Sequence, residues 1–126
     1  MNIPDDLRYS TDHEWARLED GKVRIGITDY AQDALGDVVY VDVPAVGTDV
    51  KLNDSFSEVE STKSVSDIFA PVAGTIVEVN AGLADAPERL NADPYGEGWI
   101  CVIEPTDAAE VDALLDAGAY RALIEG

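Results

Sequence analysis

The segment Glu58-Val-Glu-Ser-Thr-Lys63-Ser-Val-Ser-Asp67 decides the fold, together with Ile68-Phe-Ala-Pro-Val-Ala-Gly-Thr-Ile-Val-Glu-Val-Asn80, which follows it directly. It places one of only three lysines in the chain between two β-prone runs. Small hydroxylated residues surround Lys63, and apolar residues resume at Val59 and Val65, as expected of a hairpin with a polar tip. The pattern therefore predicts that Lys63 is displayed at a turn and is not packed in a core.

Strand signals dominate the chain up to Ile103. His13–Leu18 and Lys22–Ile27 flank Asp20-Gly21, a dipeptide suited to the positive backbone angles of a tight hairpin turn. Thr28 and Asp29 can cap a short helix that Gly36 ends. Further strands are expected at Val38–Val43, Ser55–Ser61, Val65–Phe69, Thr75–Val79 and Trp99–Ile103.

The last part of the chain is expected to contain fewer strands. Ala81–Gly98 is rich in glycine and proline, which predicts a loop with one helical turn around Ala86–Leu90. Asp107-x-x-Glu110 resembles a capping box, and Val111, Leu114 and Leu115 follow at helical spacing until Gly118. Tyr120, Leu123 and Ile124 repeat that spacing in a second short helix, and we expect both helices to cover the sheet.

A short internal repeat in the sequence supports a β-sandwich. Val41–Val50 recurs as Ile68–Val77, so that Pro44 and Pro71 stand 27 residues apart. The two copies bracket Lys63, as a sandwich whose halves are related by an approximate two-fold axis requires.

Length and charge restrict the class of protein. With 126 residues, the chain is expected to form a single domain over residues 1–126. A hydrophobic content of 46% argues against disorder, and a net charge of -18 argues against binding to nucleic acid or to anionic membranes. Acidic residues spread along the whole chain favour a halophilic source, with an ordinary acidic protein as the alternative.

The chemistry-bearing residues do not form a catalytic set. With one histidine and one cysteine, no nucleophile-and-base pair, metal cluster or phosphate loop can be assembled, so we expect a non-enzyme without a metal whose chemistry comes from a cofactor. Cys101 lies in an apolar run and is expected to be a buried structural thiol. The amino terminus shows no basic region or apolar run, so a cytoplasmic protein is expected.

The Lys63 segment resembles the attachment hairpin of lipoyl carrier domains, and its Glu-Ser-x-Lys-x-x-Ser-Asp form resembles the H proteins of the glycine cleavage system. Three more stretches carry the same resemblance: Tyr9-Ser-x-Asp-His-Glu-Trp15, Ile25-Gly-Ile-Thr-Asp-Tyr-Ala-Gln-Asp-x-Leu-Gly-Asp37 and Asn91-x-Asp-Pro-Tyr-Gly-Glu-Gly-Trp-Ile100. Several motifs in the same order are more specific than one short pattern.

This resemblance implies a fold, a cofactor and partners. The fold is mainly β, a lipoyl-domain-like barrel-sandwich hybrid with a short internal helix and C-terminal helices. Lipoate is attached to Lys63 by an amide bond, on a monomer. The implied partners are a pyridoxal-phosphate glycine decarboxylase, a tetrahydrofolate-dependent aminomethyltransferase, a dihydrolipoamide dehydrogenase that uses FAD and NAD, and a lipoate-attaching enzyme.

The resemblance also implies roles for acidic residues. Glu14 and Asp67 match positions that line the cleft where the loaded arm rests, although either could be one more solvated carboxylate. Asp12 departs from the family, which commonly has a small hydroxylated residue there, and adds an acid beside that cleft. From their position beside the tip, Glu60 and Ser61 are expected to be recognised by the lipoate-attaching enzyme, whereas His13 is expected to be structural.

Three other functions remain open at this point. The chain could be an H-like protein that relays lipoyl groups, or a lipoyl domain of another multienzyme complex. A biotin carrier is disfavoured because Thr62 and Ser64, not methionines, flank the lysine. A function of another class is an unmodified acidic interaction module, which a lipoyl-sized mass on Lys63 would exclude.

Overall fold

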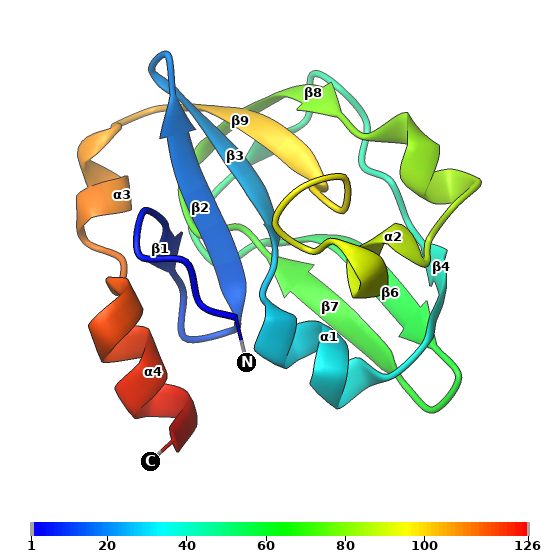
Figure 1. Cartoon of the computed structure of the whole chain (residues 1–126). Coiled ribbons are helices and arrows are strands. Elements are labelled where there is room, and N and C mark those ends of the chain that lie inside the picture. Colours follow the sequence, from blue (N-terminus) through cyan, green and yellow to red (C-terminus); the bar gives the residue numbers. More distant parts are fainter. Residues whose placement is uncertain (1, 126) are drawn as a thin grey trace.

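The computed structural model describes residues 2–125, which form mainly β-strands in two sheets (Figure 1). The strands are β1 (Arg8–Tyr9), β2 (Glu14–Glu19), β3 (Lys22–Ile27), β4 (Val38–Val41), β5 (Asp49–Val50), β6 (Ser55–Ser61), β7 (Val65–Phe69), β8 (Gly74–Val79) and β9 (Cys101–Pro105). The helices are α1 (Asp29–Leu35), α2 (Arg89–Ala92), α3 (Ala109–Asp112) and α4 (Ala117–Glu125), with a 3-10 helix η1 (Ala81–Ala84).

The larger sheet has the order β1-β2-β3-β9-β8-β5 among the described residues. Its β2–β3 hairpin turns at Asp20 and Gly21, whose φ angles of 52° and 78° are the left-handed values that this turn requires. Val23, Ile25 and Ile27 alternate along β3 and are all buried, so the predicted hairpin and its buried face are confirmed.

The smaller sheet has the order β4-β6-β7, with β6 and β7 forming the hairpin that carries Lys63. The chain leaves this sheet twice, from β4 to β5 and from β7 to β8, and each time it joins the larger sheet. The two copies of the internal sequence repeat form these two crossings. β5 and β8 pair through Asp49 and Thr75. The predicted barrel-sandwich arrangement is therefore confirmed.

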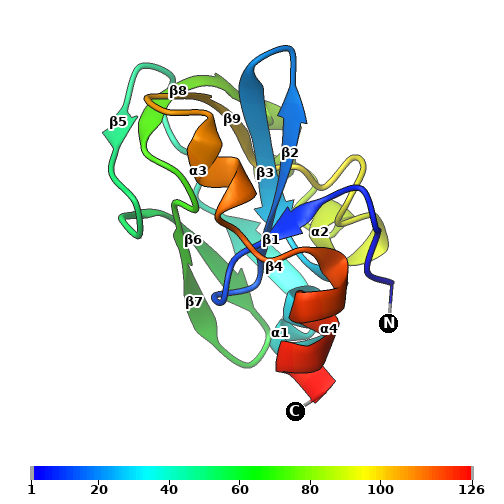
Figure 2. The same ribbon diagram turned by 90° about the vertical axis from the view of Figure 1, so that its left-hand side faces the viewer.

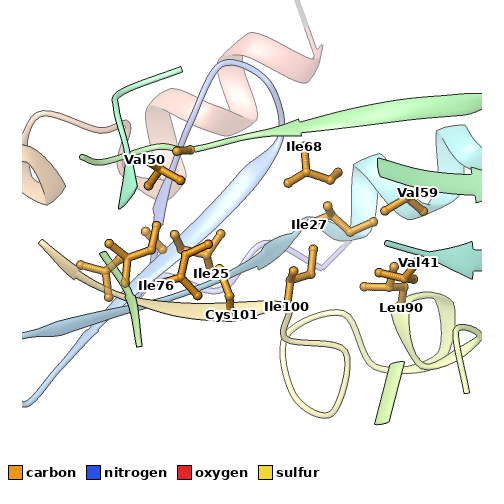
Figure 3. Packing of buried hydrophobic residues seen from close by; sticks show 14 of the residues in the cluster. Ile25, Ile27, Val41, Val50, Val59, Ile68, Ile76, Leu90, Ile100 and Cys101 are labelled. Carbon is orange, nitrogen blue, oxygen red and sulfur yellow. The ribbon is translucent and has the colours of Figure 1, made fainter. Parts of the chain in front are cut away.

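The main core fills the space between the two sheets (Figure 3). Ile25, Ile76 and Cys101 contribute from the larger sheet, and Val59 and Ile68 from the smaller one. Cys101 is fully buried, as its apolar run predicts. A second, smaller cluster forms where α4 covers β1; it contains Ile3, Leu7, Tyr9, Trp15, Ala117 and Tyr120.

The prediction of a helix from Asp107 through Leu115 is wrong beyond Asp112, where α3 ends. Leu115 instead exchanges two backbone hydrogen bonds of 2.8 Å with Tyr9, which extends the edge of the larger sheet. The expected capping box does not close, because the Glu110 carboxylate accepts from the Ala73 amide at 3.2 Å. Long-range partners thus outcompete the local helical signal.

The predicted role of Gly118 is also wrong, because this glycine lies inside α4 and does not end a helix. Asp116 accepts a hydrogen bond from the Ala119 amide at 2.8 Å and so caps the start of α4. The second predicted helix is therefore confirmed, but it begins earlier than its apolar spacing suggested.

Smaller differences concern the ends of elements. The helical turn predicted around Ala86–Leu90 is present but shifted, as α2 (Arg89–Ala92), and η1 was not predicted. β9 begins at Cys101 and not at Trp99, and β4 ends at Val41 and not at Val43. The two-residue strands β1 and β5 were not predicted, because so short a strand has no detectable period. No helix among residues 2–125 combines the length and apolar character needed to cross a membrane.

Candidate functional site

Lys63 lies at the exposed tip of the β6–β7 hairpin, as predicted, and the turn around it is held by Ser61. The Ser61 amide donates to the Ser64 carbonyl at 2.8 Å. The Ser61 Oγ accepts from the amides of Lys63 and Ser64 at 3.3 and 3.1 Å. The turn therefore has a defined shape although its lysine side chain is exposed to solvent.

The turn also rests against the connection between α1 and β4, at the same end of the molecule in both views (Figures 1 and 2). The Thr62 amide donates to the Asp37 carbonyl at 3.0 Å. The Lys63 side chain passes over Gly36, where the Cβ of any larger residue would lie 3.3 Å from the Lys63 Cε. Gly36 caps the end of α1 with φ 81° and ψ -159°, a conformation that glycine alone adopts readily.

A hollow of about 230 Å³ lies beside the turn, between α1, the β7 strand and the loop before β2. Its wall combines apolar side chains with carboxyl, hydroxyl and ring groups. The lining residues are Asp12, His13, Ile27, Tyr30, Ala31, Ala34, Leu35, Ser64, Val65, Ser66, Asp67 and Ile68. One face of α1, formed by Tyr30, Ala31, Ala34 and Leu35, is thus one side of this hollow.

The structure brings two of the three predicted acidic residues to this hollow. Asp12 and Asp67 both line it, and both are exposed. Glu14 does not line it and is only 2% exposed. The Ser10 hydroxyl donates to the Glu14 carboxyl at 2.6 Å, and the Glu14 amide donates back to the Ser10 Oγ at 3.0 Å. Glu14 is therefore a buried, hydrogen-bonded group beneath the site.

Burial changes the chemistry of Glu14. Removal of the carboxyl from water raises its pKa to about 7, and the hydrogen bond from Ser10 opposes this rise. Asp12 adds a smaller upward contribution to the same pKa. Near neutral pH the Glu14 carboxyl therefore exchanges a proton, unlike an ordinary surface glutamate.

His13, which was expected to be structural, is half-buried and also lines the hollow. Its Nδ1 lies 2.8 Å from the Tyr120 hydroxyl, which in turn lies 2.8 Å from Thr28 Oγ1. Thr28 accepts from the Ala31 amide at 3.1 Å and so caps α1. Burial lowers the pKa of His13, which favours the neutral ring near pH 7. Tyr120, which the sequence placed only on a helix face, therefore ties α4 to the site.

The predicted recognition residues differ in their surroundings. Glu60 is half-buried in β6 and pairs with Tyr40 on one side and Val65 on the other. Ser61 is committed to the turn by the hydrogen bonds described above. Within residues 2–125, no group of three or more histidine, cysteine, aspartate or glutamate side chains is arranged to hold a metal ion.

Comparisons with known proteins agree on one family. The family model of the glycine cleavage H-protein matches residues 7–126. The chain is 56% identical over 125 residues to the glycine cleavage system H protein of Anaeromyxobacter sp. (strain K), covering 99% of this chain and 98% of that protein. It is also 56% identical over 124 residues to that of Geobacillus thermodenitrificans (strain NG80-2), covering 98% of each.

A solved structure gives the same result in three dimensions. The crystal structure of a glycine cleavage system H protein from Mycobacterium marinum superposes with a TM-score of 0.89 at 45% identity. The match covers 98% of this chain and 100% of that chain. Sequence and fold are therefore similar over nearly the whole length.

Proposed function

The chain belongs to the glycine cleavage H-protein family, and from this membership we propose that Lys63 is the residue that carries its lipoyl group. Members of this family are the lipoyl carriers of the glycine cleavage system, and this chain is such a carrier. The observation that supports Lys63 is its place on a hydrogen-bonded turn at the tip of a hairpin.

The residues around Lys63 fit a lipoyl group. The lysine is exposed, and no ion pair among the described residues involves its amine, so the amine is free to form an amide bond. Lys22 and Lys51 are also exposed, but neither lies on the β6–β7 turn. When attached, lipoate supplies the pair of sulfur atoms that accepts the aminomethyl group of glycine. The rigid sheet fixes where the arm begins, and tethering keeps it near each docked enzyme.

The partners of the protein are the other components of the glycine cleavage system. We infer that these are the pyridoxal-phosphate decarboxylase, the folate-dependent aminomethyltransferase and the flavin dehydrogenase that its family resemblance implies. A lipoate-attaching enzyme that reads Glu60 and Ser61 completes the set. The protein itself supplies position and shelter and performs no catalytic step. The expected monomeric state, single domain and cytoplasmic location stay predictions.

We also infer that the hollow beside Lys63 receives the end of the arm. Its apolar floor suits the hydrocarbon and sulfur part of the group, and Asp12 and Asp67 place carboxylates on its wall. A cationic amine on the cargo would gain charge-assisted hydrogen bonds from these carboxylates. Glu14 does not line the hollow; its buried carboxyl is hydrogen-bonded to Ser10 and does not reach the cargo directly.

Mass spectrometry of the native protein tests the attachment site. A lipoyl-sized amide adduct is expected on the peptide that contains Lys63, and none on peptides that contain Lys22 or Lys51. Lys63→Arg should fold as the wild type does, because the side chain is exposed, and should support no glycine–bicarbonate exchange in a reconstituted system. An unmodified Lys63 in cells supplied with lipoate, or an active Lys63→Arg variant, would contradict the assignment.

A further inference from the structure

Asn91 in α2 is placed to control how Lys63 is displayed, although the two residues are distant in the sequence. The Asn91 Nδ2 donates to the Gly36 carbonyl at 2.8 Å, and its Oδ1 accepts from the Val38 amide at 2.8 Å. One side-chain amide thus holds the backbone on both sides of Asp37. Because Gly36 ends α1 and Val38 begins β4, Asn91 fixes the connection between this helix and this strand.

The Gly36–Val38 connection contacts the lysine turn from outside and supports it. The bonds between Ser61 and Ser64 lie within the turn, so they fix its shape but not its direction. The Thr62 amide reaches out to the Asp37 carbonyl, and the Lys63 side chain passes over Gly36. A shift of the Gly36–Val38 segment would therefore move or release the turn.

The orientation of the Asn91 amide follows from a chain of hydrogen bonds. The Asp29 carboxylate can only accept, so Gln32 turns its Nε2 toward it, at 2.7 Å. The Gln32 Oε1 then faces Asn91 and accepts from its Nδ2 at 3.1 Å. Both hydrogens of the Asn91 amide and its oxygen are thereby used, and an aspartate at this position would lack the two donors.

We propose that Asn91 is a positioning residue for the attachment of lipoate to Lys63. The proposal rests on the function proposed above, in which Lys63 is the attachment site. Asn91 acts by holding the Gly36–Val38 segment, so that the turn is presented to the attaching enzyme in one orientation. Without this support the turn keeps its internal bonds but samples several orientations, and fewer encounters with the enzyme are productive.

The first test measures lipoyl transfer to Lys63 by a purified lipoate-attaching enzyme. For Asn91→Ala and Asn91→Asp, KM is expected to rise about tenfold, the factor that corresponds to about one net hydrogen bond. The matched control is Asn80→Ala. Asn80 also donates two backbone hydrogen bonds, to Glu97 and Trp99 at 2.7 and 2.8 Å, but none to the Gly36–Val38 segment.

The second test is amide hydrogen exchange, which needs no enzyme. Asn91→Ala should accelerate exchange at Thr62 and Val38 more than at Ser61, whose amide bonds within the turn. If Asn91→Ala does not fold, Gln32→Ala should produce a smaller change in the same direction, because it frees one hydrogen of the Asn91 amide.

Two results would overturn the proposal. One is a rise in KM that is no larger for the Asn91 variants than for Asn80→Ala. The other is exchange at Thr62 that stays at the wild-type rate or changes in parallel with the whole chain. A wild-type protein that accepts no lipoyl group would contradict the proposed function instead, and exchange at Thr62 would then decide alone whether Asn91 supports the turn.

Discussion

Glu14 shows that the surroundings of a residue can reverse the role that its type suggests. Sequence resemblance places this glutamate among cleft residues, where a charged carboxylate would face the cargo. The structure buries it beneath the cleft, and burial raises its pKa to about 7. Because an isolated charge is costly in such a place, the carboxyl is easier to keep protonated than a surface glutamate.

This raised pKa predicts how stability changes with pH. The unfolded chain loses the Glu14 proton near pH 4.5, whereas the folded chain keeps it until about pH 7. Between these values the folded state binds more protons than the unfolded state. The contribution of Glu14 to the free energy of unfolding is therefore fully present below pH 4.5 and is lost as the pH rises through 7. The Glu14→Gln variant has no carboxyl at this position and does not lose stability in this way. The free energy of unfolding of the variant minus that of the wild type should therefore increase by on the order of 1–3 kcal/mol between pH 4.5 and pH 8.

Urea unfolding of both proteins at pH 4.5 and pH 8, at one salt concentration, measures this difference. The Ser10 hydroxyl can accept from a glutamine as well as donate to one, so the variant should fold. A constant difference between the two proteins over this range would show that the folded Glu14 carboxyl titrates normally.

The roles of residues whose hydrogen-bond partners lie far away in the sequence could not be predicted from the sequence. Lys63 could be found because its turn is local and its neighbours carry a recognisable pattern. Asn91 and Tyr120 could not, because the partners of one amide and one hydroxyl depend on how distant elements pack. Their only signals were a family motif for Asn91 and helical spacing for Tyr120.

At the scale of elements, local signals succeeded where they did not compete with tertiary contacts. The bounds of β3, β6, β7 and α1 agree with the predictions, because strand alternation, turn residues and the Thr28 cap all point the same way. The prediction of a helix from Asp107 through Leu115 failed beyond Asp112, because Leu115 pairs with Tyr9 at the edge of the larger sheet. A single apolar period cannot distinguish a helix from a segment that another strand will recruit.

The hollow between α1 and β7 predicts a measurable effect on the cargo. Asp12→Asn combined with Asp67→Asn should leave folding and lipoylation unchanged, since both residues are exposed. The loaded protein should release formaldehyde at least about tenfold faster, because charge-assisted hydrogen bonds contribute roughly 1.5–3 kcal/mol each.

The matched control for this pair is Asp42→Asn combined with Asp112→Asn, which changes the charge equally on exposed residues that do not line the hollow. The control should release formaldehyde at the wild-type rate. Equal rates for all three proteins would leave Asp12 and Asp67 as ordinary surface acids.

At the scale of the whole molecule, charge is the dominant feature. The chain carries a net charge of -18, and the described residues form four side-chain ion pairs, all of them at least partly exposed. Such exposed pairs contribute little each, so they do not offset the repulsion among the acids. The halophilic source inferred from composition stays a prediction.

Salt should therefore raise the melting temperature, because counterions screen the repulsion among surface carboxylates. We expect a higher melting temperature in molar potassium chloride than in dilute buffer. Glu78→Lys combined with Glu104→Lys, two exposed positions on β8 and β9, should reduce this increase. A melting temperature that does not change with salt would favour an ordinary acidic protein.

The buried cysteine has a consequence for a protein that carries a disulfide-containing arm. Thiol–disulfide exchange needs an accessible thiolate, and burial raises the pKa of the Cys101 thiol to about 12. Cys101 is the only cysteine in the chain and is fully enclosed in the core. The folded carrier therefore presents no thiol of its own to the oxidised arm, so its scaffold cannot capture that arm in a mixed disulfide.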